Sequence, residues 1–310
     1  MVEDNEIKAQ VSPFAIREGE IKTFDGKDGY VSMNQIVHKI NIGHITDIHF
    51  AILDLVNEFE FITSRQLYQM LEIKGIDPKS QDKLNNKLDA LVKSKILTRY
   101  YFTSDEGKGI YRIYCLEKMG KYLLTSKEIE CKWQPSDNTK PVAMIKKRLA
   151  GNQVLIAYLR KVKAFDSYIV KPAITAKTLG KIFKATGGAV KLTKNGKSIQ
   201  FLFEVFRREQ DWQKKLVEKM NLYKDFYENF QPGDSGFAGI PQLIFVCEDE
   251  KHMAECFREI ITNKVEIPQI KLLFTTDLRQ NKETLDDTLV EFKLVDGKYK
   301  MEDVELKLLG

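Results

Sequence analysis

The sequence predicts two domains, an α+β domain followed by an α/β domain, and three observations lead to this fold class. Three segments with helical spacing of apolar residues come first, and two strand-like segments follow them. Further along, continuous apolar runs alternate with amphipathic segments, which is typical of an α/β sheet. Between these regions, residues 131–141 hold two prolines in a polar stretch and predict a linker. With 310 residues, the chain is long enough for two cores.

The first domain, residues 45–130, is expected to begin with three helices. In each of them, apolar residues recur every three to four positions, as on the buried face of an amphipathic helix. Thr63 or Ser64 suits the N-cap of the second helix, and Asp77-Pro78 suits the first turn of the third. The three helices are expected at residues 45–56, 63–71 and 77–92.

Two strands follow these helices. Residues 96–102 and 110–116 are rich in β-branched and aromatic residues, and residues 104–109 form the predicted turn between them. Three helices followed by a hairpin resemble a winged helix-turn-helix, in which the third helix enters the major groove of DNA. A closing helix is expected at residues 118–126. Residues 1–44 are expected to form an arm on this domain, and the alternative is a small hairpin of residues 21–24 with 30–33.

The third predicted helix carries side chains that suit DNA. Amides and hydroxyls can pair with base edges, while lysines can contact phosphates. Against this, exposed helices carry lysines and amides for solubility alone, and many winged-helix domains bind proteins. Residues 45–140 hold fifteen Lys and Arg against fourteen Asp and Glu, and Asp105 and Glu106 in the predicted turn would repel phosphate. The candidate DNA-binding residues are Lys79, Ser80, Gln81, Lys83, Asn85, Asn86 and Lys87.

Positive charge is concentrated in one later segment. Residues 141–198 hold thirteen Lys and Arg and a single acid, Asp166, whereas the net charge of the whole chain is +5. Such a block predicts a surface that binds a polyanion, and the alternative is that acids of the C-terminal third neutralise it in the fold. Within the block, a helix over residues 175–185 would align three lysines on one side to hold flanking phosphates. These lysines are Lys177, Lys181 and Lys184.

The second domain, residues 142–310, is expected to alternate helices and strands around an α/β sheet. Asn195-Gly196 is a good signal for a hairpin turn. The tail after residue 282 is expected to add an edge hairpin. Helices are expected at residues 143–162, with an interruption near Gly151, and at residues 210–230 and 251–262. Strands are expected at residues 187–193, 198–206, 242–247, 270–276, 289–294 and 299–309.

One carboxylate sits where a nuclease could hold a metal ion. Glu204 lies near the end of a predicted central strand, the setting of the metal site in nucleases of the restriction-endonuclease type. That chemistry needs two carboxylates and usually a lysine two residues after the second, but Phe206 stands there. We therefore expect an inactive nuclease-like fold in which Glu204 pairs with Arg207 or a lysine of the basic block. The alternative is a metal-dependent nuclease that uses Glu204 and Asp166.

These features together resemble the replication-relaxation family, whose members belong to plasmids and conjugative elements. The family strand reads Glu-x-Asp-Arg, which Glu204 and Arg207 match, whereas Phe206 replaces the aspartate and Gly187-Gly188-Ala189 replaces a Pro-Asp-Ala motif. The resemblance implies a non-enzymatic protein that binds double-stranded DNA in replication, mobilisation or regulation of the element. Another reading is a scaffold that docks on a relaxase or replication initiator. Helix-turn-helix proteins often bind two half-sites of DNA as dimers, so a homodimer is expected.

Several other functions find no support in the sequence. The four cysteines and four histidines form no metal-binding motif, and no phosphate-binding loop or nucleophile elbow is present, so no metal or cofactor is expected. The sequence has no run of about 18 apolar residues, the length that a membrane span needs. Its N-terminus is acidic, unlike a signal peptide. We expect a cytoplasmic protein with reduced thiols.

Overall fold

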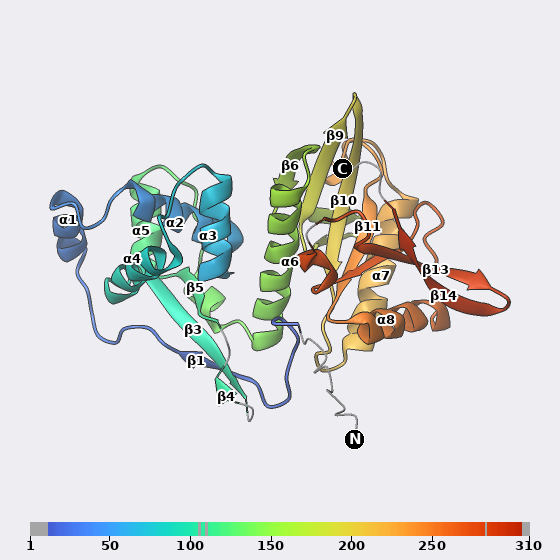
Figure 1. Cartoon of the computed structure of the whole chain (residues 1–310), viewed down its shortest axis with the longest axis horizontal. Helices are drawn as coiled ribbons and strands as arrows, with labels where there is room; N and C mark the ends of the chain where they lie inside the picture. The colour runs from blue at the N-terminus through green and yellow to red at the C-terminus, as the bar shows by residue number, and fades with distance from the viewer. Residues whose placement is uncertain (1–11, 105–106, 109–110, 283, 306–310) are drawn as a thin grey trace, which may run out of the picture.

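The computed structural model describes residues 12–104, 107–108, 111–282 and 284–305 of the chain. It is a mixed α/β structure with two lobes side by side, the first spanning residues 21–126 and the second residues 142–304 (Figure 1). In the described part of the chain, no helix is both long and apolar enough to cross a membrane.

The first lobe packs five helices around a small antiparallel sheet. Its strands run in the order β1-β3-β5-β2, and β4 pairs with the end of β3. The helices are α1 (Met33–Asn41), α2 (Asp47–Phe59), α3 (Ser64–Ile73), α4 (Gln81–Lys93) and α5 (Lys118–Ser126). The strands are β1 (Ile21–Phe24), β2 (Ile62–Thr63), β3 (Leu97–Ser104), β4 (Gly107–Lys108) and β5 (Ile113–Leu116).

Side-chain caps decide where the helices of this lobe begin. Thr63 accepts the backbone N–H of Gln66, and the Gln66 side chain accepts the N–H of Thr63, so α3 starts with a capping box. The predicted start of α4 at Asp77 is wrong. Lys79 has a left-handed φ of 68°, which a right-handed helix excludes, so the helix begins only after the cap of Ser80.

The alternative of an N-terminal hairpin is also wrong. β1 pairs with β3 in antiparallel register, with Ile21 opposite Thr103, and so extends the sheet of the first lobe. Residues 30–32 form no strand, because Ser32 caps α1 and Met33 starts it. Asp105 and Glu106, the acids of the predicted turn, lie outside the described residues.

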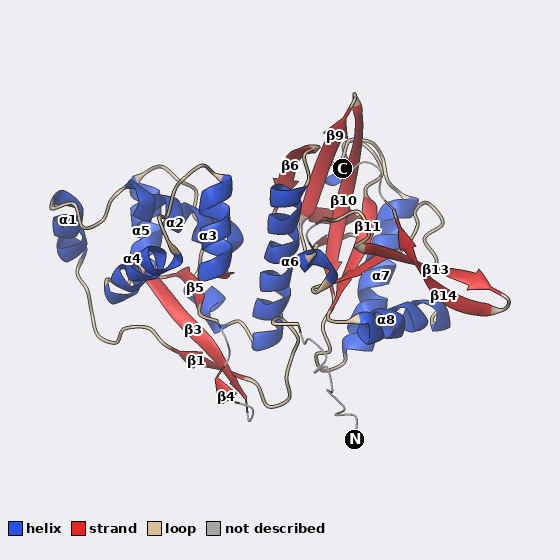
Figure 2. Cartoon of the chain, in the orientation of Figure 1, coloured by secondary structure: helices blue, strands red, loops and turns tan. Residues whose placement is uncertain are grey.

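The second lobe is built on a seven-stranded sheet with helices on its faces (Figure 2). Its order is β14-β13-β12-β11-β10-β9-β6, with β10, β11 and β12 parallel and the remaining pairs antiparallel. The strands are β6 (Phe165–Ile169), β9 (Ala189–Lys194), β10 (Lys197–Val205), β11 (Gln242–Cys247), β12 (Leu273–Thr276), β13 (Leu289–Val295) and β14 (Lys298–Val304). The helices are α6 (Val142–Lys161), α7 (Trp212–Glu228) and α8 (Glu250–Thr262), with short 3-10 turns η2 (Asp234–Gly236) and η3 (Arg279–Asn281).

The predicted helix over residues 175–185 is wrong. Residues Ala173–Ala176 form β7 and Lys181–Lys184 form β8, which pair as an antiparallel hairpin. Along β7, Ile174 and Ala176 are buried while their neighbours are exposed, which is the period of two of a strand. Ile182 and Phe183 add β-branched and aromatic character, which favours the strand.

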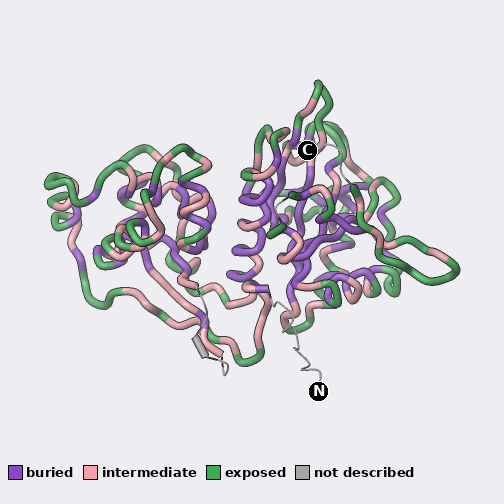
Figure 3. The backbone as a smooth tube through the Cα atoms, viewed as in Figure 1, coloured by how far each residue is buried: buried purple, intermediate pink, exposed green. Residues whose placement is uncertain are grey.

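Helix α6 lies between the lobes and is buried along most of its length (Figure 3). The Asn152 side chain donates to the backbone oxygens of Phe59 and Phe61 at 3.3 and 2.7 Å, and Gln66 donates to the oxygen of Leu149 at 2.8 Å. The helix continues through Gly151, contrary to the expected interruption. A Cβ there would lie 2.5 Å from the oxygen of Thr186, so glycine allows this close approach.

Both segments that join the lobes are held by specific contacts. In the predicted linker, the 3-10 helix η1 (Pro135–Thr139) forms, and Asn138 donates to the oxygen of Leu116 at 2.9 Å. In the arm before β1, the N–H of Ile16 donates to Glu248 at 3.1 Å, and Glu20 pairs with the buried Lys146 at 2.5 Å. The arm therefore contacts the second lobe before it joins the sheet of the first.

Glu60 is an ionic junction between the lobes. It follows α2, and its carboxylate contacts Lys140 of the linker, Lys171 after β6, and Arg148 of α6 at 3.7 Å. Although burial opposes ionisation, Lys171 and Lys140 hold the pKa of Glu60 below its usual value. A carboxylate with a depressed pKa stabilises the fold above its unfolded pKa and loses that contribution in acid.

The Glu60→Gln substitution is expected to lower the free energy of unfolding by about 1–3 kcal/mol at neutral pH, since three cations lose their shared anion. The deficit should shrink as pH falls below the unfolded pKa of about 4.3, and it should vanish below the lowered pKa of folded Glu60, where the side chain is protonated in both states. Urea unfolding at several pH values measures this. Glu130→Gln, which removes an exposed carboxylate paired with Lys132, is the control and should change little. An equal deficit at every pH would contradict this role.

Candidate nucleic-acid interface

Helix α4 is held by its apolar face and has hollows on both sides. The Ser80 hydroxyl accepts the backbone N–H of Lys83, and Leu84, Leu88 and Leu91 are buried in the core of the first lobe. The candidate DNA-binding residues of this helix therefore lie on its flanks and its exposed side.

The larger hollow is a cleft of about 940 Å³ between the two lobes. Gln81, Asn85 and Asp89, which follow one another at four-residue spacing, line it from α4. Gln153 and Arg160 line it from α6 on the other lobe. The Gln81 amide donates to the Asn85 oxygen at 3.2 Å, so this pair is partly ordered before any ligand arrives.

Basic side chains outnumber acids around this cleft. Arg99 lies between Asp25 and Asp89, and Arg112 contacts the same Asp25 at 2.6 Å, so these two arginines are largely neutralised. The other three basic residues come from both lobes. The five basic lining residues are Arg65, Arg99, Arg112, Arg160 and Lys161, and Asp89 is the acid among the lining residues.

The remaining cations are available to a ligand. Arg65 at the start of α3 is exposed and makes no ion pair within the described residues. Arg160 approaches Glu72 only at 3.7 Å, and its side chain is 43% exposed, so this pair is weak. Lys161 donates to the backbone oxygens of Gln280 and Lys282, which do not neutralise its charge. The cleft therefore keeps positive charge contributed by both lobes.

Two buried amide oxygens add unused acceptors. The Oε1 atoms of Gln69 and Gln280 have no hydrogen-bond partner among the described residues, although both residues line the cleft. A buried acceptor without a donor is costly, which favours a ligand or water that donates there.

The smaller hollow, about 500 Å³, lies on the opposite flank of α4 beside His49. Lys79 there pairs with Asp77 at 2.8 Å. The seven residues singled out on the third helix are thus divided: Gln81 and Asn85 line the cleft, and the Ser80 hydroxyl is occupied as a cap. The residues beside the smaller hollow are Lys79, Lys83, Asn86 and Lys87.

The prediction that Lys177, Lys181 and Lys184 share one side of a helix is wrong. Lys177 lies in the turn after β7 and pairs with Asp234 at 2.6 Å. Lys181 and Lys184 are exposed on β8, three positions apart, and side chains with odd spacing point to opposite faces of a strand. No common phosphate-binding row results.

About half of the cations in the basic block pair with acids in the fold. Of its thirteen cations, at least seven pair with carboxylates, and several of these acids belong to the first lobe rather than the C-terminal third. The expectation of one continuous basic surface over residues 141–198 is therefore wrong. The pairs are Lys146–Glu20, Lys147–Glu209, Arg148–Glu60, Arg160–Glu72, Lys171–Glu60, Lys177–Asp234 and Lys191–Asp166.

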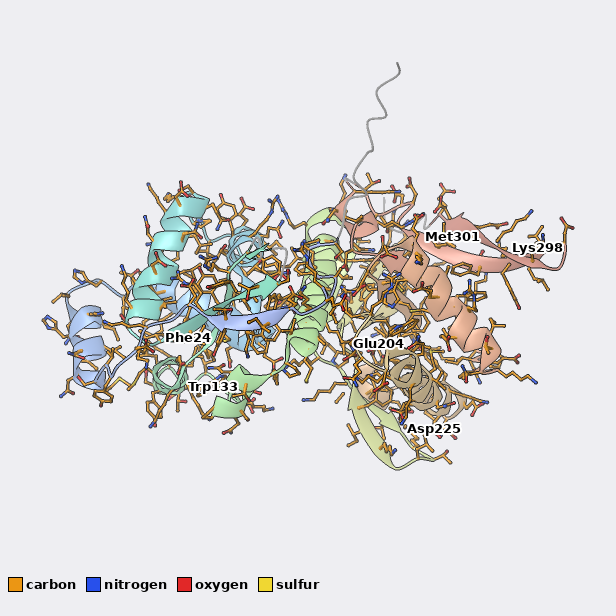
Figure 4. The ribbon with its side chains drawn as sticks, turned by 90° about the horizontal axis from the view of Figure 1, so that it is seen from below. Phe24, Trp133, Glu204, Asp225, Lys298 and Met301 are labelled. Carbon is orange, nitrogen blue, oxygen red and sulfur yellow. The ribbon has the colours of Figure 1, made fainter. Side chains whose placement is uncertain are left out.

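Glu204 lies buried in the second lobe, at the end of β10 (Figure 4). It accepts the hydroxyls of Tyr223 at 2.6 Å and Thr186 at 2.7 Å, and Lys219 lies 3.4 Å away. Burial and the nearby carboxylate raise the pKa of Tyr223, so its hydroxyl stays protonated and donates. These contacts occupy the carboxylate with neutral donors and one lysine.

The predicted partner Arg207 pairs instead with Asp277, at 2.8 and 2.9 Å, and both are buried. β10 ends at Val205, so Arg207 lies beyond the strand that carries Glu204. Sequence reasoning missed this pair because Asp277 follows a different strand, β12. Its position directly after a buried apolar run was the available signal.

Asp166 and Glu204 are not brought together. Asp166 lies on β6 beside the Leu192 end of β9, exposed and paired with Lys191 at 2.8 Å, whereas Glu204 extends beyond the Ala189 end. At about 3.3 Å per residue, this places them more than about 13 Å apart along the sheet. The proposed nuclease pair of Glu204 with Asp166 is therefore wrong.

A cluster that the sequence did not reveal lies on another part of this lobe. Cys247, His252 and Cys256 are buried together, although they form no familiar metal-binding motif. The spacing of His252 and Cys256, four residues apart on one predicted helix, was a signal that could have found them.

If Glu204 serves the fold, Mg²⁺ should not raise the melting temperature of the protein, because ligands stabilise only when they bind the native state. Glu204→Gln should lower the free energy of unfolding by about 1–3 kcal/mol through weaker hydrogen bonds to Tyr223 and Thr186. Asp166→Asn, at an exposed pair, is the control and should change little. Thermal melts with and without Mg²⁺ test this. A Mg²⁺-dependent rise that Glu204→Gln abolishes would indicate a metal site instead.

Comparisons with known proteins add little. No family model matches the chain, and no curated protein matches it. Among solved structures, the restriction endonuclease FokI is similar over 75% of this chain and 43% of its own length, at 9% identity and a TM-score of 0.27. The chain thus spans less than half of that protein, and a likeness this weak carries no argument about function.

Proposed function

We propose that this protein binds double-stranded DNA without catalysing a reaction, and that its first lobe is a winged helix with α4 as the recognition helix. The order α2, α3, α4, then β3 and β5, supports this reading. In such a domain, the start of the second helix and the third helix lie together on the DNA-facing side. Here Arg65 occupies the first position, and Gln81 and Asn85 occupy the second.

The observation that carries the proposal is the gathering of cations and amides around one cleft. Arg65 from α3 and Arg160 and Lys161 from α6 line the same cleft as Gln81 and Asn85 of α4. Arginine suits phosphate oxygens, and amides suit base edges. A DNA backbone that crosses the mouth of this cleft would meet positive charge from both lobes.

The second lobe fits the role of a support rather than an enzyme. We infer a nuclease-like fold from its central parallel strands, flanking helices and the carboxylate of Glu204. Tyr223, Thr186 and Lys219 contact this carboxylate, and none of the hydrogen bonds or ion pairs of Glu204 among the described residues involves a second acid. Two-carboxylate metal chemistry therefore lacks its second ligand at this position.

The biological setting follows from the resemblance to the replication-relaxation family. We propose a cytoplasmic protein of a plasmid or conjugative element that acts as a homodimer on two half-sites. A relaxase or replication initiator would be a partner at the same DNA. Immunoprecipitation from cells that carry the element, with and without nuclease treatment, separates a DNA-mediated association from a direct protein contact.

The double substitution Arg65→Ala/Arg160→Ala is expected to weaken binding to duplex DNA. If each arginine neutralises one phosphate, the slope of log affinity against log salt should fall by about 1.8 for the pair. Fluorescence anisotropy with a labelled duplex at several salt concentrations measures both quantities.

The matched control is Lys181→Ala/Lys184→Ala, which removes the same charge from the exposed β8 and should preserve the slope. Equal losses in the two double variants would reduce the effect to net charge and contradict the assignment of the cleft. A salt response that is flat in the native protein would contradict DNA binding altogether. Cleavage of the duplex in Mg²⁺ would favour an enzyme.

A further inference from the structure

Two thiols and an imidazole meet in the core of the second lobe. Cys247 is the last residue of β11, and His252 and Cys256 lie one turn apart on α8, which packs beside that strand. One candidate ligand atom from each residue lies within 4.8 Å of the others. All three residues are 0% exposed. Strand and helix thus present two sulfurs and a nitrogen to a common point.

His252 has a ring nitrogen without a partner. Its Nδ1 lies 3.3 Å from the backbone nitrogen of Glu248, which donates to it weakly, while Nε2 has no hydrogen-bond partner among the described residues. Trp212 packs edge-on against the ring, with centroids 5.0 Å apart. A buried polar nitrogen without a partner is costly and calls for an explanation.

Each of the three side chains can supply a lone pair to a metal ion. An imidazole binds a metal ion through one ring nitrogen, and the other nitrogen then carries the ring proton. A metal ion bound at Nε2 of His252 would place that proton on Nδ1, which would then give up the long hydrogen bond that it accepts from the N–H of Glu248. A cysteine binds as the thiolate, so binding releases its thiol proton.

The donor set selects the class of ion. Thiolate sulfur with imidazole nitrogen favours Zn²⁺ or another soft ion, whereas Mg²⁺ and Ca²⁺ prefer oxygen. One Zn²⁺ with two thiolates and a neutral imidazole has no net charge, which suits a site removed from water. Binding would release two thiol protons, one from each cysteine, and form two Zn–S bonds and one Zn–N bond.

We propose that Cys247, His252 and Cys256 bind one Zn²⁺, which fastens α8 to β11. With three protein ligands, the fourth tetrahedral position would be filled by a single water that is enclosed with the ion and cut off from bulk solvent. The site is separate from the interlobe cleft and does not depend on DNA binding. The role is structural, because the ligands are enclosed between a helix and a sheet.

The first experiment measures zinc in the full-length protein by elemental analysis, after purification without chelators and with a matched buffer blank. The native protein should hold one zinc per chain. Cys256→Ser and His252→Gln should each reduce the content at least tenfold. Cys115→Ser, which changes an equally buried cysteine of the first lobe, is the control and should retain full zinc.

The second experiment uses the native protein alone, because variants of buried residues can fail to fold. Chelator-treated protein is titrated with Co²⁺, which should give thiolate-to-cobalt absorption that saturates at one equivalent and disappears when Zn²⁺ is added. Zn²⁺ should also raise the melting temperature.

Several results would overturn the site. These are no uptake of Zn²⁺ or Co²⁺ by the native protein, full zinc content in Cys256→Ser, or copper as the bound ion. A Cys247–Cys256 disulfide, found by mass spectrometry of the unreduced protein, would also overturn it.

Discussion

The structure depends on α6 being buried by both lobes at once. Asn152 shows how this is achieved. Its side-chain amide donates hydrogen bonds to backbone oxygens between α2 and β2 in the first lobe, while α6 itself packs on the large sheet of the second lobe. Because this amide has no exposed surface, burying it is favourable only when both lobes keep its hydrogen-bond acceptors in position. The lobes therefore share one continuous apolar core, and the cleft beside α6 has fixed walls.

The contact between the lobes accounts for several of the paired cations in the basic block. Glu60 of the first lobe and Glu20 of the arm before β1 neutralise Arg148, Lys171 and Lys146 of the second lobe. Partly buried ion pairs of this kind are costly to break from one side, whereas exposed pairs contribute little. The cations consumed in holding the lobes together are thus unavailable to a polyanion. Arg65 of the first lobe and Arg160, whose pair with Glu72 at 3.7 Å is weak, line the cleft.

Most elements of the fold could be predicted because the spacing of apolar residues along the sequence indicates which face of a helix or strand is buried. The helix at residues 118–126 and the strand at 242–247 have the predicted bounds, and Asn195-Gly196 forms the turn between β9 and β10. The hairpin β7–β8 was missed because three lysines happened to follow helical spacing. The alternate burial of Ile174 and Ala176 was the better guide.

The site could be predicted only in part, because counting charges along the chain does not show which cations form ion pairs in the folded protein. Gln81 and Asn85 were found as exposed amides of a helix, and they do line the cleft. Arg65 and Arg160 were not found, because no sequence motif indicates that two arginines nearly a hundred residues apart line the same cleft. Likewise, Glu204 was recognised by its place on a strand, but Tyr223 and Lys219 approach it from α7, a separate helix.

The central claim is that DNA lies against α3, α4 and the facing side of α6. Hydrogen exchange by mass spectrometry, with and without a saturating duplex, tests it most directly because it reports on every element at once. We expect slower exchange in residues 64–73, 81–93 and 153–161, and no change in residues 173–184. Protection confined to the β7–β8 hairpin, or no protection anywhere, would contradict the account.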